Sequence, residues 1–362
     1  MKPLQKKSVQ LKILAFFPKK RIPAYVFRIE AYLKFINNYS YEFIMKLEEE
    51  SVFYSGSLYQ KIFLFIKIFF RRCYQLLKGN YNIVLINREA FPVFGIFFEY
   101  IICKVLKKKL IFDFDDAIWI SNVSEGNKKY GFLKSFSKFE KIMKMADVII
   151  AGNKYLADYA LQRNANTHII PSCIDLDLYT LKEKSKKNTV CIGWCGSEST
   201  LQYLLSIKDV LINLQVKYGK SIYFKIIGSK DNVKIEGLNV LSTKWTKDTE
   251  VEQLRELDIG IMPLPNDEWA KGKCSMKGIQ YMGLGISTIM SAVGMNLEVI
   301  THEENGFLAN SKKEWFEYLS ILIEDKVLRD KFGIAGRKVI EENYSIQAWK
   351  NKWIQLVTSY DK

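Results

Sequence analysis

The feature that most constrains this chain is the alternation of short apolar runs with longer segments of helical spacing. The first series of apolar runs covers residues 11–17, 41–46, 82–86, 109–114, 146–151 and 168–170, and helical spacing is found at 24–37 and 132–145. A second series covers residues 190–195, 223–227, 239–241, 259–262 and 287–291. Strands that alternate with helices in this way form parallel sheets covered on both faces. We therefore predict an α/β fold with two Rossmann-like, doubly wound parallel sheets.

The length of 362 residues suits two domains, because single cores usually stop growing near roughly 250 to 300 residues. A polar stretch without periodicity, LKEKSKKN at 181–188, is typical of a linker. We predict a first domain at 1–183, a second at 184–345, and a terminal helix at 346–362 that crosses back to the first. Ligands of such sheets bind beyond the carboxyl ends of the strands, which predicts a cleft between the domains.

The charge of the chain favours anionic partners. Lys and Arg total 54 against 39 Asp and Glu, for a net charge of +15. Nucleic acid, phosphorylated small molecules and acidic lipid surfaces all fit such a balance. The basic clusters at 19–21, 71–72 and 107–109 are too short for a nucleic-acid arm.

Cysteine and histidine usage argues against disulfides and structural metal. The six cysteines form no CxxC pair, and two histidines are too few for most zinc sites. The first ten residues precede no signal-type apolar core, so we expect a reducing cytoplasm rather than secretion.

Two apolar segments raise the question of membrane contact. Residues 62–70 and 90–103 are shorter than the roughly 18 to 20 apolar residues of a spanning helix, and each carries a charge. The first segment lies between Lys61 and the pair Arg71 and Arg72, which suits a helix in the membrane interface. A core helix with lysines that reach out to solvent fits equally well.

The segment IFDFDDAIW, residues 111–119, ends a buried-type strand with Asp113, Asp115 and Asp116. Carboxylates at the carboxyl end of a strand lie at the expected cleft, where they can accept hydrogen bonds from sugar hydroxyls or stabilise a developing cation. A cap for the next helix is the simpler alternative for any one of them.

The segment IGWCGSEST, residues 192–200, opens the second half directly after a strand. Gly196 lets backbone approach a ligand, and Ser197 stands where a helix begins, so free N–H groups there can hold a phosphate. An ordinary strand-to-helix turn with a serine cap would have a similar sequence.

The richest segment is KGKCSMKGIQYMGLGISTIMS, residues 271–291. Lys273 and Lys277 are four residues apart, which places two ammonium groups on one side of a helix start, and Gln280 follows about one turn later. Gly294 and Asn296 then form a second tight loop that enters a helix. A solvated lysine face between ordinary turns is the competing interpretation.

Taken in order, these motifs resemble the retaining glycosyltransferases of family 4, which have the GT-B fold. The residues that carry the resemblance are IGWCGS at 192–197, DIGIMPL at 258–264, KCSMK at 273–277 and QYMGLG at 280–285. The segments FDFDDAIW, ADVIIAGNKYLADY and IIPSCID of the first half look like the same branch.

The resemblance implies that the second domain holds a UDP- or GDP-linked sugar and the first domain holds the acceptor. It implies catalytic roles for Lys273, Lys277, Asp115 and Asp116, donor contacts for Gly196, Ser197, Gln280, Gly294, Asn296 and Glu298, and acceptor contacts for Arg28 and Asp113. No cofactor and no metal are implied.

Two departures from the family pattern concern the donor site. Many members carry two glutamates eight positions apart, where this chain has Gly272 and Gln280. A glutamine can bond ribose hydroxyls through its amide but offers no anionic oxygen. Many members also carry Arg and Lys after the junction strand, which 192–200 lacks, so phosphate binding is expected to depend on Lys273 and Lys277.

We therefore expect a metal-independent, retaining, hexosyltransferase-type enzyme. Its expected acceptor is a glycan or lipid-linked saccharide of surface polysaccharide biosynthesis, and its expected location is the cytoplasmic face of an anionic membrane. One alternative is a non-catalytic module that binds nucleic acid, although no RNP, KH or helix-turn-helix signature supports that partner. Another alternative is a sugar-nucleotide epimerase on the same fold.

Overall fold

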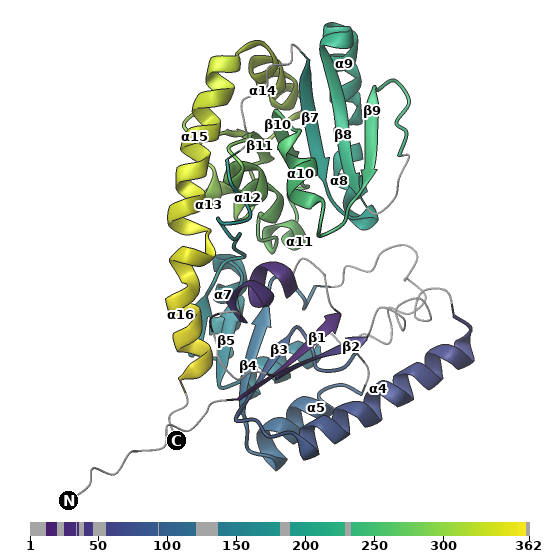
Figure 1. The fold of residues 1–362 in the computed structure, drawn as a ribbon, viewed down its shortest axis with the longest axis vertical. Coiled ribbons are helices and arrows are strands. Elements are labelled where there is room, and N and C mark those ends of the chain that lie inside the picture. Colours follow the sequence, from purple (N-terminus) through teal and green to yellow (C-terminus); the bar gives the residue numbers. More distant parts are fainter. Residues whose placement is uncertain are drawn as a thin grey trace, which may run out of the picture.

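The computed structural model describes residues 12–19, 25–33, 35, 40–45, 56–92, 94–120, 137–181, 189–228 and 233–359. Two α/β bodies, here called the first and the second domain, are stacked along the long axis of the molecule (Figure 1). Two consecutive helices, α15 (Lys326–Asn343) and α16 (Ile346–Thr358), run along one side of both bodies (Figure 1).

The first domain contains one sheet of six parallel strands in the order β2-β1-β3-β4-β5-β6. The strands are β1 (Ile13–Lys19), β2 (Ser40–Met45), β3 (Ile83–Asn87), β4 (Lys109–Phe114), β5 (Val148–Ala151) and β6 (Thr167–Ile169). Every residue of β3 and β5 is buried. Burial on both faces is the reason that these strands are continuous apolar runs rather than alternating ones.

Helices cover both faces of this sheet. They are η1 (Val26–Glu30), α2 (Ala31–Leu33), α4 (Leu58–Lys78), α5 (Phe97–Tyr100), η2 (Ile101–Val105), α6 (Ser137–Met145) and α7 (Lys154–Leu161). The longest of them, α4, begins with a capping box in which the Ser57 hydroxyl accepts from the Gln60 N–H and the Ser57 N–H donates to the Gln60 side chain.

The second domain repeats the plan with the strand order β12-β11-β10-β7-β8-β9, again all parallel. The strands are β7 (Val190–Cys195), β8 (Ile222–Gly228), β9 (Val240–Lys244), β10 (Ile259–Met262), β11 (Ser287–Ser291) and β12 (Phe307–Ala309). The helices are α8 (Glu198–Leu205), α9 (Lys208–Tyr218), η4 (Gly219–Ser221), α10 (Glu250–Arg255), α11 (Glu268–Lys271), α12 (Met276–Gly283), α13 (Asn296–Val299), α14 (Lys312–Glu324) and α15. The two parallel sheets predicted from the apolar runs are confirmed.

The terminal helix α16 packs against the first domain, although it follows the second in sequence. Its Trp353 stacks on Tyr32 with ring centroids 4.9 Å apart, and Ile346 and Val357 belong to the same buried cluster as Phe17. Several predicted features lie outside the described residues: the boundary at 183/184, residues 24, 34, 36–37 and 132–136 of the predicted helices, and most of the basic cluster at 19–21. The domain boundary stays a prediction.

Candidate functional site

The first aspartate after β4 forms a buried ion pair. The Arg28 guanidinium donates to both carboxylate oxygens of Asp113, with the shortest contact at 2.6 Å, and Asn87 donates to the same carboxylate at 2.8 Å. Both charged side chains are about 1% exposed. Such a pair holds β3, β4 and η1 together. Direct acceptor contacts by Arg28 and Asp113 stay a prediction, and in this structure each side chain meets protein groups.

The other two aspartates share one arginine. Arg88 Nη2 lies 2.8 Å from Asp115 Oδ1 and 2.6 Å from Asp116 Oδ2. Arg88 directly follows β3 and has a left-handed φ of 64°, a conformation that costs energy in a residue with a side chain. Burial alone would raise the pKa of Asp115, but the charges of Arg88, Arg28 and Lys273 lower it. Asp115 is therefore held as a carboxylate.

An ion pair joins the two domains at this point. Lys273 Nζ, from the loop before α12, lies 2.7 Å from Asp116 Oδ1. Beside it, the Cys274 thiol donates to the Asp115 carbonyl at 3.3 Å, and the Asn153 amide donates to the Lys273 carbonyl at 3.1 Å. We call residues 271–277, which include Lys273 and Lys277, the lysine segment. It faces the predicted aspartates across the domain junction.

Close packing at the junction requires a glycine. A Cβ at Gly152 would come within 2.4 Å of Cys274 Sγ and 3.2 Å of Asp115 Cα. The residue follows β5, so three chain segments from two domains meet there with no room for a side chain.

The second lysine lies at the start of α12, in the first turn. Lys277 Nζ sits 5.4 Å from the centroid of the Trp194 ring, at the end of β7, and its side chain is half-buried. Burial lowers the pKa of Lys277 to about 8. An ammonium group that has lost part of its hydration has much to gain from an anionic ligand.

The start of α12 is held by a buried hydrogen-bond chain. Ser275 has a left-handed φ of 49° and donates from Oγ to Asn296 Oδ1 at 2.7 Å. Asn296 in turn donates to the Ser291 carbonyl at 2.8 Å, and it is 1% exposed. Asn296 therefore fixes the position of Ser275, between Lys273 and Lys277, relative to the end of β11.

The glycine of the next loop is needed for two reasons. Gly294 has φ of +54°, and a Cβ there would lie 2.8 Å from Lys271 backbone atoms. The loop it forms leads into α13, where Glu298 is exposed. Burial raises the pKa of Glu298, while the nearby charge of Lys154 from α7 of the first domain lowers it. This glutamate thus lies at the junction as well.

The turn between β7 and α8 contains Gly196 and Ser197, the two residues predicted to hold a phosphate. The Gly196 N–H donates to the Ile227 carbonyl at 2.9 Å, which ties β7 to β8. Ser197 is exposed, and its Oγ lies 2.9 Å from Ser199 Oγ rather than on a backbone N–H of the helix. Ser197 therefore does not cap the first turn of α8 with its side chain. An anion-binding helix start requires backbone N–H groups that no side chain caps, and this helix start meets that condition.

Gln280 is buried in a chain of hydrogen bonds. Its Nε2 donates to the Tyr179 hydroxyl at 2.8 Å, and that hydroxyl donates to Glu250 Oε2 at 2.9 Å. The Trp245 indole N–H donates to the other oxygen of Glu250 at 2.6 Å. A carboxylate thus lies one hydroxyl away from the glutamine.

Residues 186–325 match the family model of the glycosyl transferases group 1. We call the second domain, which contains these residues, the group 1 domain, after the family model that it matches. An uncharacterised glycosyltransferase of Methanocaldococcus jannaschii is 24% identical over 318 residues, which cover 81% of this chain and 77% of that protein.

Two solved structures share the architecture of the whole chain. Anabaena HepE in complex with UDP and glucose superposes with a TM-score of 0.71 at 14% identity, covering 97% of this chain and 100% of that one. A glycosyltransferase from Rickettsia africae gives 0.67 at 14% identity, covering 98% and 100%. The fold is GT-B, as expected from the sequence.

At Gly272, where the resemblance to family 4 implies a glutamate, the chain makes a close contact between the two domains. A Cβ at Gly272 would lie 2.7 Å from Cβ and 2.9 Å from the backbone nitrogen of Ala117, in the first domain. The place where a side chain would stand is therefore occupied by the other domain.

The hydrogen-bond chain at Gln280, the second position where the resemblance implies a glutamate, can be tested by exchanging the amide of Gln280 and the carboxylate of Glu250. We expect Gln280→Glu to lower stability by about 2 kcal/mol, because two buried carboxylates would compete for the single proton of the Tyr179 hydroxyl. Adding Glu250→Gln should restore most of the loss, since one donor and one acceptor would again flank the hydroxyl. Thermal unfolding of both single variants and the double variant measures the coupling. Additive changes in the unfolding midpoint would contradict the hydrogen-bond chain.

Sequence reasoning missed several residues of the site. Arg88 follows a strand of the first sheet without belonging to a recognisable motif. Asn153 lies in the segment ADVIIAGNKYLADY, to which the sequence assigned no site role. Glu250 begins a short helix, and Trp269, whose ring centroid lies 4.6 Å from Lys273 Nζ, belongs to another. Their position after strands or beside the lysine segment was the available signal.

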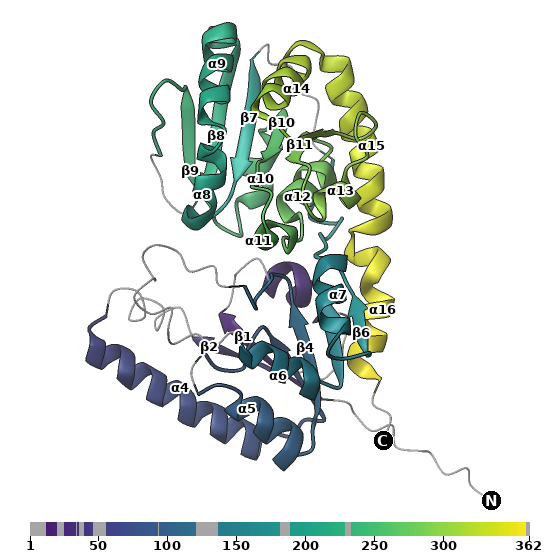
Figure 2. The same ribbon diagram turned by 180° about the vertical axis from the view of Figure 1, so that it is seen from behind.

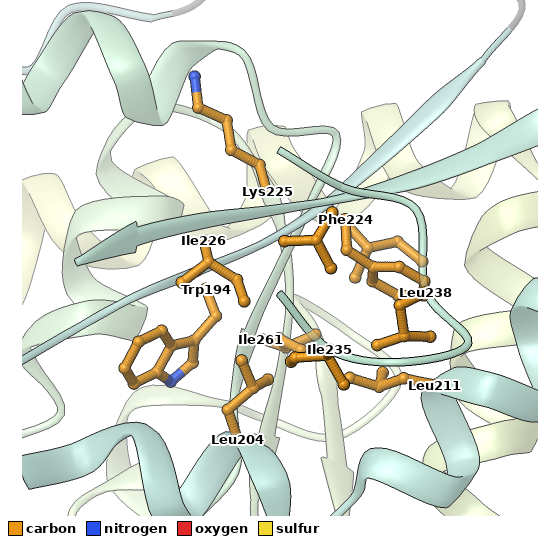
Figure 3. A pocket seen from close by; sticks show the side chains of 11 residues that line it. Trp194, Leu204, Leu211, Phe224, Lys225, Ile226, Ile235, Leu238 and Ile261 are labelled. Carbon is orange, nitrogen blue, oxygen red and sulfur yellow. The ribbon is translucent and has the colours of Figure 1, made fainter. Parts of the chain in front are cut away.

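A small cavity elsewhere in the group 1 domain belongs to its core. It is lined by apolar side chains of β7, β8, β10 and the neighbouring helices, among them Trp194, Leu211 and Ile261 (Figure 3). The one charged lining residue, Lys225, points away from the others and pairs with Glu256 at 2.6 Å. The lining of the cavity is therefore almost entirely apolar, as in a packing gap of the core.

Among the residues that the structure describes, no three His, Cys, Asp or Glu side chains are grouped as metal ligands would be. The same residues include no helix with the length and apolarity of a membrane span.

Proposed function

We propose that the chain is a retaining glycosyltransferase of family 4 that needs no metal ion. It transfers a sugar from a UDP- or GDP-linked donor to a glycan or lipid-linked saccharide, and it works at the cytoplasmic face of the membrane in surface polysaccharide biosynthesis. The group 1 domain supports the transferase chemistry, and UDP bound to the similar Anabaena protein supports a nucleotide-sugar donor.

The observation that carries the proposal is the ion pair between Lys273 and Asp116 across the domain junction. It joins a cation of the second domain, which we propose holds the donor, to a carboxylate of the first domain, which we propose holds the acceptor. A donor diphosphate would take the place of Asp116 at Lys273 Nζ, and Lys277 would approach it from the first turn of α12. The N–H groups at the start of α8 near Ser197 would complete the anion site.

Catalysis then consists of stabilising negative charge on the leaving group. The bond between the anomeric carbon and the phosphate oxygen breaks, and a bond from the acceptor oxygen forms on the same face. The proton of the acceptor hydroxyl passes to the leaving phosphate, so the protein need supply no base. Lys273 and Lys277 stabilise the developing negative charge, and Asp115 and Asp116 stabilise the oxocarbenium-like centre.

The remaining predicted residues have supporting roles in this proposal. The Gly294 loop and Glu298 approach the sugar, Asn296 holds the lysine segment, and the Gln280 amide meets the ribose. Arg28 and Asp113 support the acceptor side from within the first domain.

Nucleotide release tests the proposal directly. The chain is incubated with a panel of UDP- and GDP-sugars, with and without a membrane lipid extract as acceptor source, and released UDP or GDP and thermal shift are measured. We expect one donor to give acceptor-stimulated release, with product of unchanged anomeric configuration by NMR. A changed sugar still attached to its nucleotide would instead indicate an epimerase. No release together with salt-dependent oligonucleotide binding would indicate the nucleic-acid module.

A further inference from the structure

The helix α4 has apolar side chains on two opposite faces. Leu64, Ile68 and Leu76 are buried against the first sheet. Large side chains on the opposite face are exposed instead, and six of them are between 49% and 85% exposed: Tyr59, Phe63, Ile66, Phe70, Tyr74 and Leu77. Leu58 and Ile62 near the start of α4 are exposed as well. The spacing of the six, at three and four residues, places them in one stripe along the helix. The buried stripe explains the fold, and the exposed stripe has no role in it.

The stripe continues onto the neighbouring segment. The Phe69 ring lies 5.7 Å from Phe70, 5.5 Å from Phe94 and 5.6 Å from Phe97, and the last three rings are all exposed. Tyr100, one turn further on, is 52% exposed. We call the six side chains of α4 together with Phe94, Phe97 and Tyr100 the apolar face. So large a group of exposed rings is unusual on a protein without a partner for it.

The apolar face lies at the end of the molecule away from the second domain. In both views α4 and α5 run side by side along the far margin of the first domain (Figures 1 and 2). The exposed fractions of the side chains in the apolar face show that the described residues leave them largely uncovered.

Cations surround the apolar face. The helix α4 contains five basic residues and no acidic one in the sequence LYQKIFLFIKIFFRRCYQLLK. Lys67 and Lys78 on α4, and Lys104 and Lys107 beside it, are exposed. A second copy of the same face would bring like charges together, which disfavours self-association. A surface with anionic groups above an apolar interior would complement both the exposed apolar side chains and the lysines around them.

We propose that the apolar face docks onto an anionic phospholipid bilayer, with α4 lying in the plane of the interface. The ring side chains of the stripe enter the acyl region, and the lysines meet lipid phosphates. This inference assigns residues to the membrane contact in the proposed function and rests on it only for biological context, because docking requires no donor, acceptor or transfer step. It places the domain proposed to hold the acceptor next to the lipid.

Vesicle cosedimentation of the full chain tests the docking. Vesicles of phosphatidylglycerol and phosphatidylcholine in equal parts are compared with phosphatidylcholine alone, at low and high salt. We expect binding to the anionic vesicles, weakened by salt. The variant Phe63→Ser with Phe70→Ser should bind at least about tenfold more weakly, because two phenylalanine rings no longer bury apolar area in the acyl region. Lys67→Gln with Lys78→Gln should lose about fivefold per lysine.

The control variant removes equally exposed apolar side chains from the other domain, as Val216→Ser with Val327→Ser. It should bind like the wild type. Circular dichroism and UDP-induced thermal shift verify that every variant is folded, and they report on the group 1 domain separately from docking. Equal vesicle binding by wild type and the double phenylalanine variant would overturn the inference. So would a wild-type dimer that this variant converts to monomer without any change in vesicle binding, since the face would then be a self-interface.

Discussion

Replacing Lys277 with alanine is expected to lower turnover at least about tenfold while leaving the protein folded. The ammonium group lies over the Trp194 ring in the first turn of α12, at the end of β7, where the proposed diphosphate would sit. Its pKa is lowered to about 8 because burial removes water from it. A charge that is poorly hydrated in the free enzyme interacts strongly with a leaving group that gains negative charge.

The control for this substitution is Lys331→Ala, at an exposed position of α15 far along the chain from the site. It should leave the kinetics unchanged. Steady-state kinetics with the donor identified by the panel measure both variants. Normal turnover of the Lys277→Ala protein would remove Lys277 from the site.

The lowered pKa also predicts the direction of two pH effects. As pH rises through about 8, Lys277 loses its proton in the folded enzyme, so kcat/KM should fall, and in a Lys277→Met variant this fall should disappear. Because the folded state binds fewer protons than the unfolded state between pH 8 and the ordinary pKa of lysine, the charged Lys277 destabilises the fold at neutral pH. Lys277→Met should therefore raise the unfolding midpoint at pH 7. A lower midpoint would attribute its lost activity to unfolding instead.

The parallel sheets and the two halves of the site followed from local sequence patterns. Strands buried on both faces must be continuous apolar runs, and residues that directly follow such strands must lie at the cleft edge. Asp116 follows β4 closely, so the end of that strand was enough to predict its position. Lys273 follows α11 rather than a strand, and it was predicted from its spacing to Lys277 at a helix start and from the family resemblance.

Partners from distant parts of the chain were beyond those patterns. Asp113 and Asp115 look equivalent in the sequence. Asp113 pairs in the interior with Arg28, which is 85 residues away, whereas Asp115 pairs with Arg88 and is partly exposed. The same limit applies to Gln280, whose hydrogen-bond partner Tyr179 is 101 residues away. Local spacing carries no information about which side chains tertiary packing will bring together.

The segment at 62–70 shows a different limit. The sequence left open whether it is a core helix or an interfacial one, because its apolar residues occupy most of the helix circumference. The structure buries Leu64 and Ile68 and exposes Phe63, Ile66 and Phe70, so the helix has a core face and a second apolar face. The two interpretations were not exclusive, and periodicity cannot separate two stripes that overlap in sequence.

Replacing Asp116 with asparagine is expected to impair sugar transfer more than donor binding. Asp116 Oδ1 accepts from Lys273 and Oδ2 accepts from Arg88 Nη2, so this single carboxylate neutralises one cation from each domain. Asparagine keeps the shape but removes the charge, which weakens the contact between the domains and leaves the positive centre of the transition state without its carboxylate. Lys273 stays available to the donor diphosphate.

We accordingly expect kcat to fall about tenfold or more, while the donor dissociation constant changes less than about threefold. Calorimetry with UDP measures donor binding, and kinetics with saturating donor measure transfer. Asp209→Asn is the matched control, because Asp209 forms an exposed ion pair with Lys312 at 2.9 Å in the second domain and should affect neither quantity. Unchanged transfer by the Asp116→Asn protein would contradict the cleft role of this carboxylate. Equal losses in binding and transfer would show that it serves the donor instead, because a residue acting on the positive centre is needed only once the bond to phosphate begins to break.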